Sequence, residues 1–183
     1  KVIESRNLYY DKQKAEKHFG FFFLYIIFYP KLVAGPIERA QNLLPQLRAC
    51  RPFSYAAASS GIQLMLWGLF KKVVIADRVA LFVNQVYSLD NPADFTGAKL
   101  LIAGIFFAFQ IYCDFSGYSD IARGAARVMG IRIMENFRYP YGAASVAEFW
   151  QRWHISLSTW FRDYLYIPLG GNRVAVPRWY FNV

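Results

Sequence analysis

A histidine lies among polar residues at helical spacing in the run VAEFWQRWHISLSTWFRDYLY, residues 146–166, which we expect to form one helix. On such a helix His154 shares a face with three polar residues, because residues three and four apart lie together. These are Gln151, Ser158 and Arg162. Burial disfavours the imidazolium, so a histidine in a dry site tends to be neutral near pH 7. A neutral imidazole can take a proton from a hydroxyl, which is the task of a general base.

The same spacing has a structural explanation. His154 would then hydrogen-bond within a helix bundle, or the helix would lie at a membrane interface with its polar face in water. On spacing alone, we favour this structural explanation over the catalytic one.

A second polar group occupies the run FQIYCDFSGYSD, residues 109–120. Acids within an apolar span are functional candidates by default. The alternative is that Asp120 pairs with Arg123 or Arg127, and that Asp114 bonds to a neighbouring helix; the two explanations weigh equally. The candidates in this run are Gln110, Asp114, Ser116, Tyr118 and Asp120.

Charged residues flank the histidine. Arg152, Arg162 and Asp163 could contact a phosphorylated or carboxylated acyl donor. They could also anchor the segment at a membrane interface, and we favour the anchor explanation.

The elements that would position these residues are apolar blocks. The chain has 183 residues, of which 56% are hydrophobic and 19% aromatic, with a formal net charge of +9. Apolar residues gathered in blocks indicate lipid or a deeply buried bundle. The basic residues fall between the blocks, as in loops on the cytoplasmic side of a membrane protein. No nucleic-acid-binding motif or glycine-rich phosphate loop is present in the sequence, so we expect no nucleic-acid partner.

Three blocks are candidate spans. Residues 19–34 are short for a bilayer and interrupted by Pro30, so we expect a short, kinked or re-entrant piece. Residues 61–83 are long enough to span. Residues 99–121 would cross back in the opposite direction. Gly104 and Ala108 within them have a spacing typical of helix packing. Charges inside residues 61–83 need partners in protein or water. These charges are Lys71, Lys72, Asp77 and Arg78.

The loop between the last two blocks is acidic, with Asp90 and Asp94, and the flanking loops are basic. This asymmetry predicts that the acidic tip faces outside and the basic ends face the cytoplasm. No segment alternates between turn signals as a strand would. The predicted fold class is all-α, a polytopic transmembrane helical bundle. We expect residues 1–183 to be a single partial domain, cut at both ends.

Five runs of the sequence resemble the membrane-bound O-acyltransferase (MBOAT) family, in its alginate O-acetyltransferase-like branch, with the D-alanyl transferases of teichoic acid as more distant relatives. The last run is long and specific, and together the runs extend over nearly all of the chain. They are YPKLVAGPIER (29–39), GLFKKVVIADR (68–78), YCDFSGYSDIARG (112–124), NFRYPY (136–141) and FWQRWHISLSTWFRDYLYIPLGGNR (149–173).

The resemblance implies tilted helices around a funnel that crosses the bilayer. It implies transfer of an acyl group from a cytoplasmic thioester, such as acetyl-CoA, to a hydroxyl at the outer side, with no bound cofactor and no metal. His154 falls on a histidine that the family is thought to place in the funnel. A second family histidine would lie beyond Val183, and which of the two is the base stays open. The candidates for lining the tunnel are Asp114, Ser116, Tyr118, Asp120, Gln151, Arg152, Trp153, Ser158, Arg162 and Asp163.

The expected setting is a bacterial inner membrane, crossed several times. Expected partners are the lipid bilayer, the acyl donor, and an exported polysaccharide or a periplasmic acetyltransferase. Two other functions stay open: a transporter or channel component, because charges within spans also mark ion pathways, and a non-catalytic subunit that relays the acyl group or supports assembly. We expect the fragment alone to be inactive.

Overall fold

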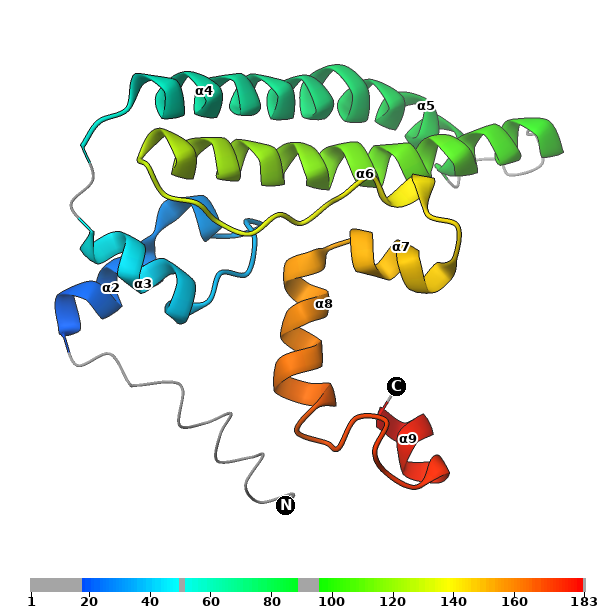
Figure 1. The fold of residues 1–183 in the computed structure, drawn as a ribbon. Coiled ribbons are helices and arrows are strands. Elements are labelled where there is room, and N and C mark those ends of the chain that lie inside the picture. The colour runs from blue at the N-terminus through cyan, green and yellow to red at the C-terminus, as the bar shows by residue number, and fades with distance from the viewer. Residues whose placement is uncertain (1–17, 50–51, 89–95, 183) are drawn as a thin grey trace. The chain divides into compact units, whose positions relative to one another are not determined.

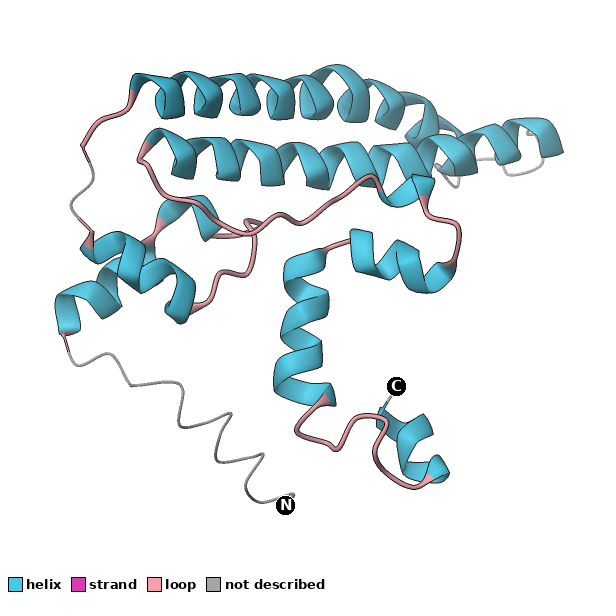
Figure 2. Ribbon diagram, viewed as in Figure 1, coloured by secondary structure: helices cyan, strands magenta, loops and turns pink. Residues whose placement is uncertain are grey.

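The computed structural model describes residues 18–49, 52–88 and 96–182 (Figure 1). Within these residues the regular structure is helical and no strand is present (Figure 2), which confirms the all-α prediction. Backbone contacts divide the chain into two compact units. One comprises residues 1–28, 36–50 and 133–183, and the other comprises residues 29–35 and 51–132. We call them the histidine unit and the helical-hairpin unit, and describe each by itself.

The helical-hairpin unit is built on two long helical stretches. Helix α4 (Tyr55–Leu69) continues through a π-helical segment, Phe70–Ala76, into α5 (Asp77–Tyr87). Helix α6 (Gly97–Val128) lies alongside α4 (Figure 1). The helix predicted over residues 61–83 is therefore confirmed, and it extends further in both directions.

Glycines set the distance between α4 and α6. A Cβ built on Gly68 would lie 2.5 Å from the carbonyl oxygen of Gly117, and one built on Gly124 would lie 2.5 Å from that of Gly61. Such distances exclude any side chain, so the two backbones touch at both crossings. Gly104 does not mark this contact, because its nearest neighbour would be the Tyr87 hydroxyl at an ordinary 3.6 Å.

Helix α6 is the described helix that is long and apolar enough to cross a membrane. Its 32 residues correspond to about 48 Å at 1.5 Å per residue, more than the roughly 30 Å of a hydrocarbon core. The block at residues 19–34 does not form such a span. Helix α2 (Phe19–Ile27) ends before Pro30, and a 3₁₀ turn, Tyr29–Lys31, follows, as the kinked interpretation expected.

In the histidine unit, α2 packs on α3 (Ala40–Arg48). Farther along the chain come a 3₁₀ turn at Pro140–Gly142, α7 (Val146–Arg152), α8 (Ile155–Phe161), a π-helical segment at Arg162–Tyr166 and α9 (Val176–Asn182). The prediction of one helix over residues 146–166 is wrong, because the helix breaks at Trp153 and His154. The acidic tip with Asp90 and Asp94, and the polar residues 1–17, lie outside the described residues.

The glycine contact between α4 and α6 predicts opposite effects for two Gly→Ala substitutions. In an ordinary helix interior alanine stabilises by up to about 1 kcal/mol over glycine. We expect Gly104→Ala to follow that rule, whereas Gly68→Ala forces the backbones apart and destabilises by about 1 to 3 kcal/mol. Thermal unfolding of the detergent-solubilised full-length protein measures both, and equal midpoints for the two variants would contradict the contact.

Candidate active site

The backbone turns sharply at His154. Helix α7 ends at Arg152, Trp153 is extended, and His154 adopts the left-handed conformation with φ 44° and ψ 53°. Its carbonyl oxygen then accepts hydrogen bonds from the amides of Leu157 and Ser158, both at 3.0 Å, and so begins α8. A left-handed residue other than glycine costs about 1 to 3 kcal/mol and persists where surrounding contacts enforce it, often at functional sites.

This break corrects the predicted polar stripe, which assumed an unbroken helix. Gln151 lies exposed on α7, before the turn, and Arg162 lies exposed after α8. The Ser158 hydroxyl donates a long 3.4 Å hydrogen bond to the Trp153 carbonyl, back across the turn. Of the four residues of the predicted stripe, Ser158 and His154 remain neighbours, because the Ser158 amide donates a hydrogen bond to the His154 carbonyl.

The side chain of His154 is half-buried, and burial lowers the pKa of His154 below its ordinary 6.5. The imidazole is therefore neutral at neutral pH, as a general base requires. Beside it, the Trp153 ring stacks on Phe149 with centroids 5.5 Å apart and meets Phe137 edge-on at 5.0 Å. These three rings form a packed aromatic cluster next to the histidine.

Two buried residues behind the turn were not predicted from the sequence as parts of a site. Asn136 is fully buried and Ser156 is 1% exposed. The Ser156 hydroxyl donates to Asn136 Oδ1 at 2.6 Å and accepts from the Ile37 amide at 3.0 Å. The Asn136 carbonyl accepts from the Ile155 amide at 2.9 Å. Both residues lie in runs that carry the family resemblance, which is the signal that could have drawn attention to them.

The segment that supplies the Ile37 amide is itself fixed. Glu38 is 3% exposed, and its carboxylate accepts from the Met134 amide at 2.7 Å and from the Asn42 side chain. Arg39 Nη2 donates to the Thr159 carbonyl at 3.1 Å. Glu38 and Arg39 thus join segments that are distant in the sequence.

The flanking charges form ion pairs within the chain. Arg152 pairs with Glu148. Arg162 pairs with Asp163 at 2.8 Å, and the same carboxylate also pairs with Arg39. Burial raises the pKa of Asp163, but hydrogen bonds from Arg162 and Arg39 outweigh it and hold the pKa below the ordinary 3.8. This stabilisation is complete above pH 3.8 and is lost as the pH falls through the lower folded pKa.

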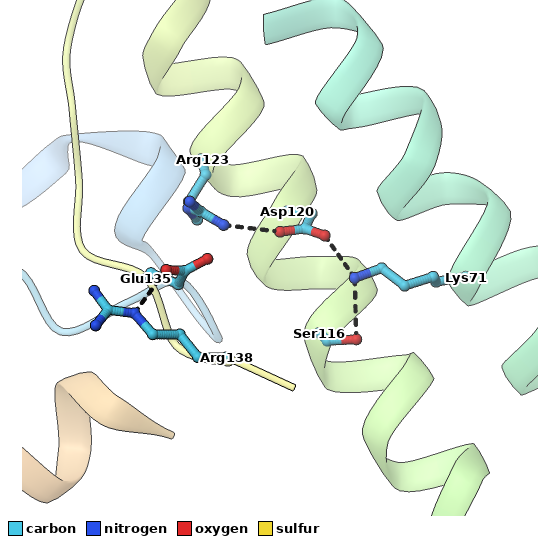
Figure 3. A network of polar contacts seen from close by, with 6 residues as sticks. All are labelled: Lys71, Ser116, Asp120, Arg123, Glu135 and Arg138. Carbon is cyan, nitrogen blue, oxygen red and sulfur yellow. Dashed lines mark hydrogen bonds and ion pairs between the residues drawn. The ribbon is translucent and has the colours of Figure 1, made fainter. Parts of the chain in front are cut away.

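The candidates of the helical-hairpin unit also belong to ion pairs. Lys71 is buried, and its Nζ lies 2.5 Å from Asp120 and 3.1 Å from the Ser116 hydroxyl (Figure 3). Asp120 also accepts from Arg123 at 3.2 Å, the arginine pairing that was one of the two explanations given for this acid. One lysine thus joins the π-helical segment to α6.

Lys72 makes a second, more exposed cluster. Its Nζ lies 2.7 Å from both Asp77 and Asp114, and this bond from the neighbouring helix was expected for Asp114. The Tyr118 hydroxyl donates to the Leu32 carbonyl at 3.3 Å.

The polar candidates of residues 114–120 and those of residues 151–163 belong to different units. A tunnel lined by both groups therefore remains a prediction. Among the described residues, no three side chains of His, Cys, Asp or Glu form a group that could hold a metal ion.

Comparison with known proteins identifies the class. The model of MBOAT, the membrane-bound O-acyltransferase family, matches residues 5–180. The chain belongs to this family.

Three relatives are informative. The chain is 41% identical over 97% of its length to a probable alginate O-acetylase, AlgI, of Pseudomonas putida, covering 36% of that protein. It is 40% identical over 86% of its length to a peptidoglycan O-acetyltransferase of Helicobacter pylori, covering 30% of it. It is 32% identical over 78% of its length to a teichoic acid D-alanyltransferase of Bacillus subtilis, covering 36% of it. The chain thus spans about a third of the length of these relatives.

The Arg39–Asp163 pair predicts a difference between two acid-to-amide substitutions. We expect Asp163→Asn to destabilise the fold by about 2 kcal/mol, below the roughly 3 to 5 kcal/mol of a fully buried pair because Arg39 is 27% exposed. Glu135→Gln removes the partner of the exposed Arg138 (Figure 3) and should cost less than about 1 kcal/mol. Unfolding midpoints of the full-length variants test this, and a loss at Glu135 equal to that at Asp163 would contradict it.

Proposed function

We propose that the full-length protein is an acyltransferase that O-acetylates an exported polysaccharide, such as alginate, from an acyl thioester such as acetyl-CoA. The observation that carries the proposal is His154: a half-buried histidine of lowered pKa, in a strained turn of a chain that belongs to the O-acyltransferase family.

In the proposed reaction, the neutral imidazole of His154 takes the proton of an acceptor hydroxyl as its oxygen attacks the thioester carbonyl. The carbon–oxygen ester bond forms and the carbon–sulfur bond breaks. The thiol leaves with the proton that the imidazolium returns, so the histidine ends the cycle neutral. General-base assistance of this kind contributes typically about 10²- to 10⁴-fold in rate.

The names of the relatives support acetyl as the acyl group. Identity is 41% and 40% to the two proteins named as acetyl-transferring and 32% to the D-alanyltransferase. The acceptors in those names are alginate, peptidoglycan and teichoic acid, all polymers with hydroxyl groups. Identity to the alginate and peptidoglycan proteins is nearly equal, so it does not choose between these two acceptors. Measuring the ester content of both polymers from the same cells distinguishes them.

The proposed setting is the bacterial inner membrane, crossed several times. Helix α6 supports a membrane location by its length and apolar composition. The protein could instead relay the acyl group to a periplasmic acetyltransferase. An assay with purified full-length protein, acetyl-CoA and polymer distinguishes this relay from complete transfer. Ester formation without a partner supports complete transfer by this protein, and ester formation only when a periplasmic partner is added supports the relay.

We expect His154→Ala in the full-length protein to lower polymer acetylation by about 10²- to 10⁴-fold at unchanged membrane abundance, because the base is lost. The matched control is His18→Ala, at the chain's other histidine, which is exposed before α2 and should leave acetylation unchanged. Ester content of the extracted polymer, measured by proton NMR, gives the result. Wild-type acetylation by the His154 variant would sink the proposal.

The lowered pKa of His154 predicts the acid side of the pH profile. Only the neutral imidazole accepts a proton, so kcat should be constant near neutral pH and should fall as the pH drops through the His154 pKa. Because burial lowers that pKa, the midpoint of the fall should lie below pH 6.5. Acetyl transfer in detergent-permeabilised membranes measures it, and a midpoint above pH 6.5 would contradict a desolvated base.

A further inference from the structure

The conformation of His154 is imposed by contacts on the residues around it. A left-handed backbone at a residue other than glycine is unfavourable by itself, so neighbouring contacts must enforce it. This backbone sets the direction of the Cα–Cβ bond from which the imidazole extends. Contacts that fix the turn therefore help to position the base.

Hydrogen bonds converge on the two residues directly after His154. Asn136 accepts from the Ile155 amide through its backbone carbonyl at 2.9 Å, and from the Ser156 hydroxyl through Oδ1 at 2.6 Å. Before the turn, the Arg138 amide donates to the Arg152 carbonyl at 2.9 Å. The chain around residues 136–138 thus holds both sides of the turn.

Ser156 extends this arrangement to a third segment. Its hydroxyl accepts from the amide of Ile37, 119 positions earlier in the sequence. That amide is held in place because the next residue, Glu38, is buried and bonded to Asn42 and Met134. The hydroxyl of Ser156 is therefore a junction between the turn, Asn136 and a fixed segment.

Burial makes the loss of a hydrogen bond at this junction unfavourable. Asn136 and Ser156 are 0% and 1% exposed, so water does not readily replace a missing partner there. Without the hydroxyl, the Ile37 amide and Asn136 Oδ1 each lose a hydrogen bond in a buried site, which favours rearrangement of the turn.

We propose that Ser156 and Asn136 are positioning residues for His154: their buried hydrogen bonds hold the histidine turn in the direction that proton transfer needs. This inference rests on the proposed function, since it concerns the same base. Neither side chain is required to touch substrate. A misplacement of about 1 Å in a catalytic group can cost about a hundredfold in rate.

The chain offers a matched control on the same helix. The Thr159 hydroxyl donates to the carbonyls of Ile155 at 2.8 Å and Ser156 at 3.0 Å, both within its own helix. Thr159→Val removes a hydroxyl three residues from Ser156 whose two hydrogen bonds both stay within α8. It should leave kcat unchanged.

The test uses the full-length protein in detergent-permeabilised membranes with labelled acetyl-CoA and the cells' own polymer, with rates expressed per molecule of folded protein. For Ser156→Ala we expect kcat about a hundredfold lower with KM for acetyl-CoA unchanged. We also expect the acid limb of the kcat profile to move up toward pH 6.5, because a loosened turn exposes the imidazole to water. A purely structural role would lower abundance without moving the acid limb.

Ser156→Cys, which keeps the shape of the side chain with a slightly larger atom and weakens both hydrogen bonds, should show the same changes to a smaller degree. If Ser156→Ala yields no folded protein, the Ser156→Cys variant tests the proposal by the same two measurements, kcat and the acid limb. The inference is overturned if kcat per folded molecule stays at the wild-type value, or if the loss comes with an unmoved acid limb.

His154→Ala, run in parallel, separates the two proposals. If it retains wild-type acetylation, the proposed function has failed, and the inference with it. If it is inactive while Ser156→Ala remains fully active, only the inference has failed.

Discussion

The left-handed backbone at His154 is the constraint on which the histidine unit depends. It lets α7 end and α8 begin within two residues, and each of these helices has only seven residues. Isolated helices of that length are not stable in water, so tertiary contacts must hold them. Those contacts come from the buried polar segment around Glu38 and from Asn136. The unfavourable turn, the short helices and the buried hydrogen bonds therefore form a single interdependent arrangement.

The helical-hairpin unit meets a different requirement, that of placing charges within apolar helices. Glycine contacts bring α4 and α6 together, and a Cβ on Gly117 would lie 3.4 Å from the Cβ of Lys71. The close approach of the two helices thus occurs where the Lys71 side chain extends to Asp120 and Ser116 on α6. Packing and electrostatics are coupled here, because a wider helix separation would lengthen the lysine contacts and leave charge unpaired in a buried site.

The parts of the fold that follow from local pattern were predictable from the sequence, and the parts that depend on distant partners were not. Long apolar runs predicted the α4–α5 stretch and α6, and Pro30 predicted the interruption of the block at residues 19–34. The partner of Asp120 at i+3 was also visible, since Arg123 lies on the same helix face. The break at His154 has no proline or glycine to mark it. It depends on Asn136 and Ile37, which are 18 and 117 positions from the histidine, and helical periodicity carries no information about such partners.

Contacts with distant residues also bear on which candidate residues are available to bind a ligand or to transfer a proton. Contact with an acyl donor was one of two explanations for Arg162 and Asp163, the less favoured one. The Asp163 carboxylate is shared with Arg39, and this ion pair joins the Arg39 segment to the end of α8. Binding of a ligand by Asp163 would compete with these two arginine contacts. His154 differs, because its burial shifts the pKa in the direction that keeps a base available at neutral pH. The lowered pKa of His154 thus suits proton transfer, whereas the Asp163 carboxylate is already paired with two arginines.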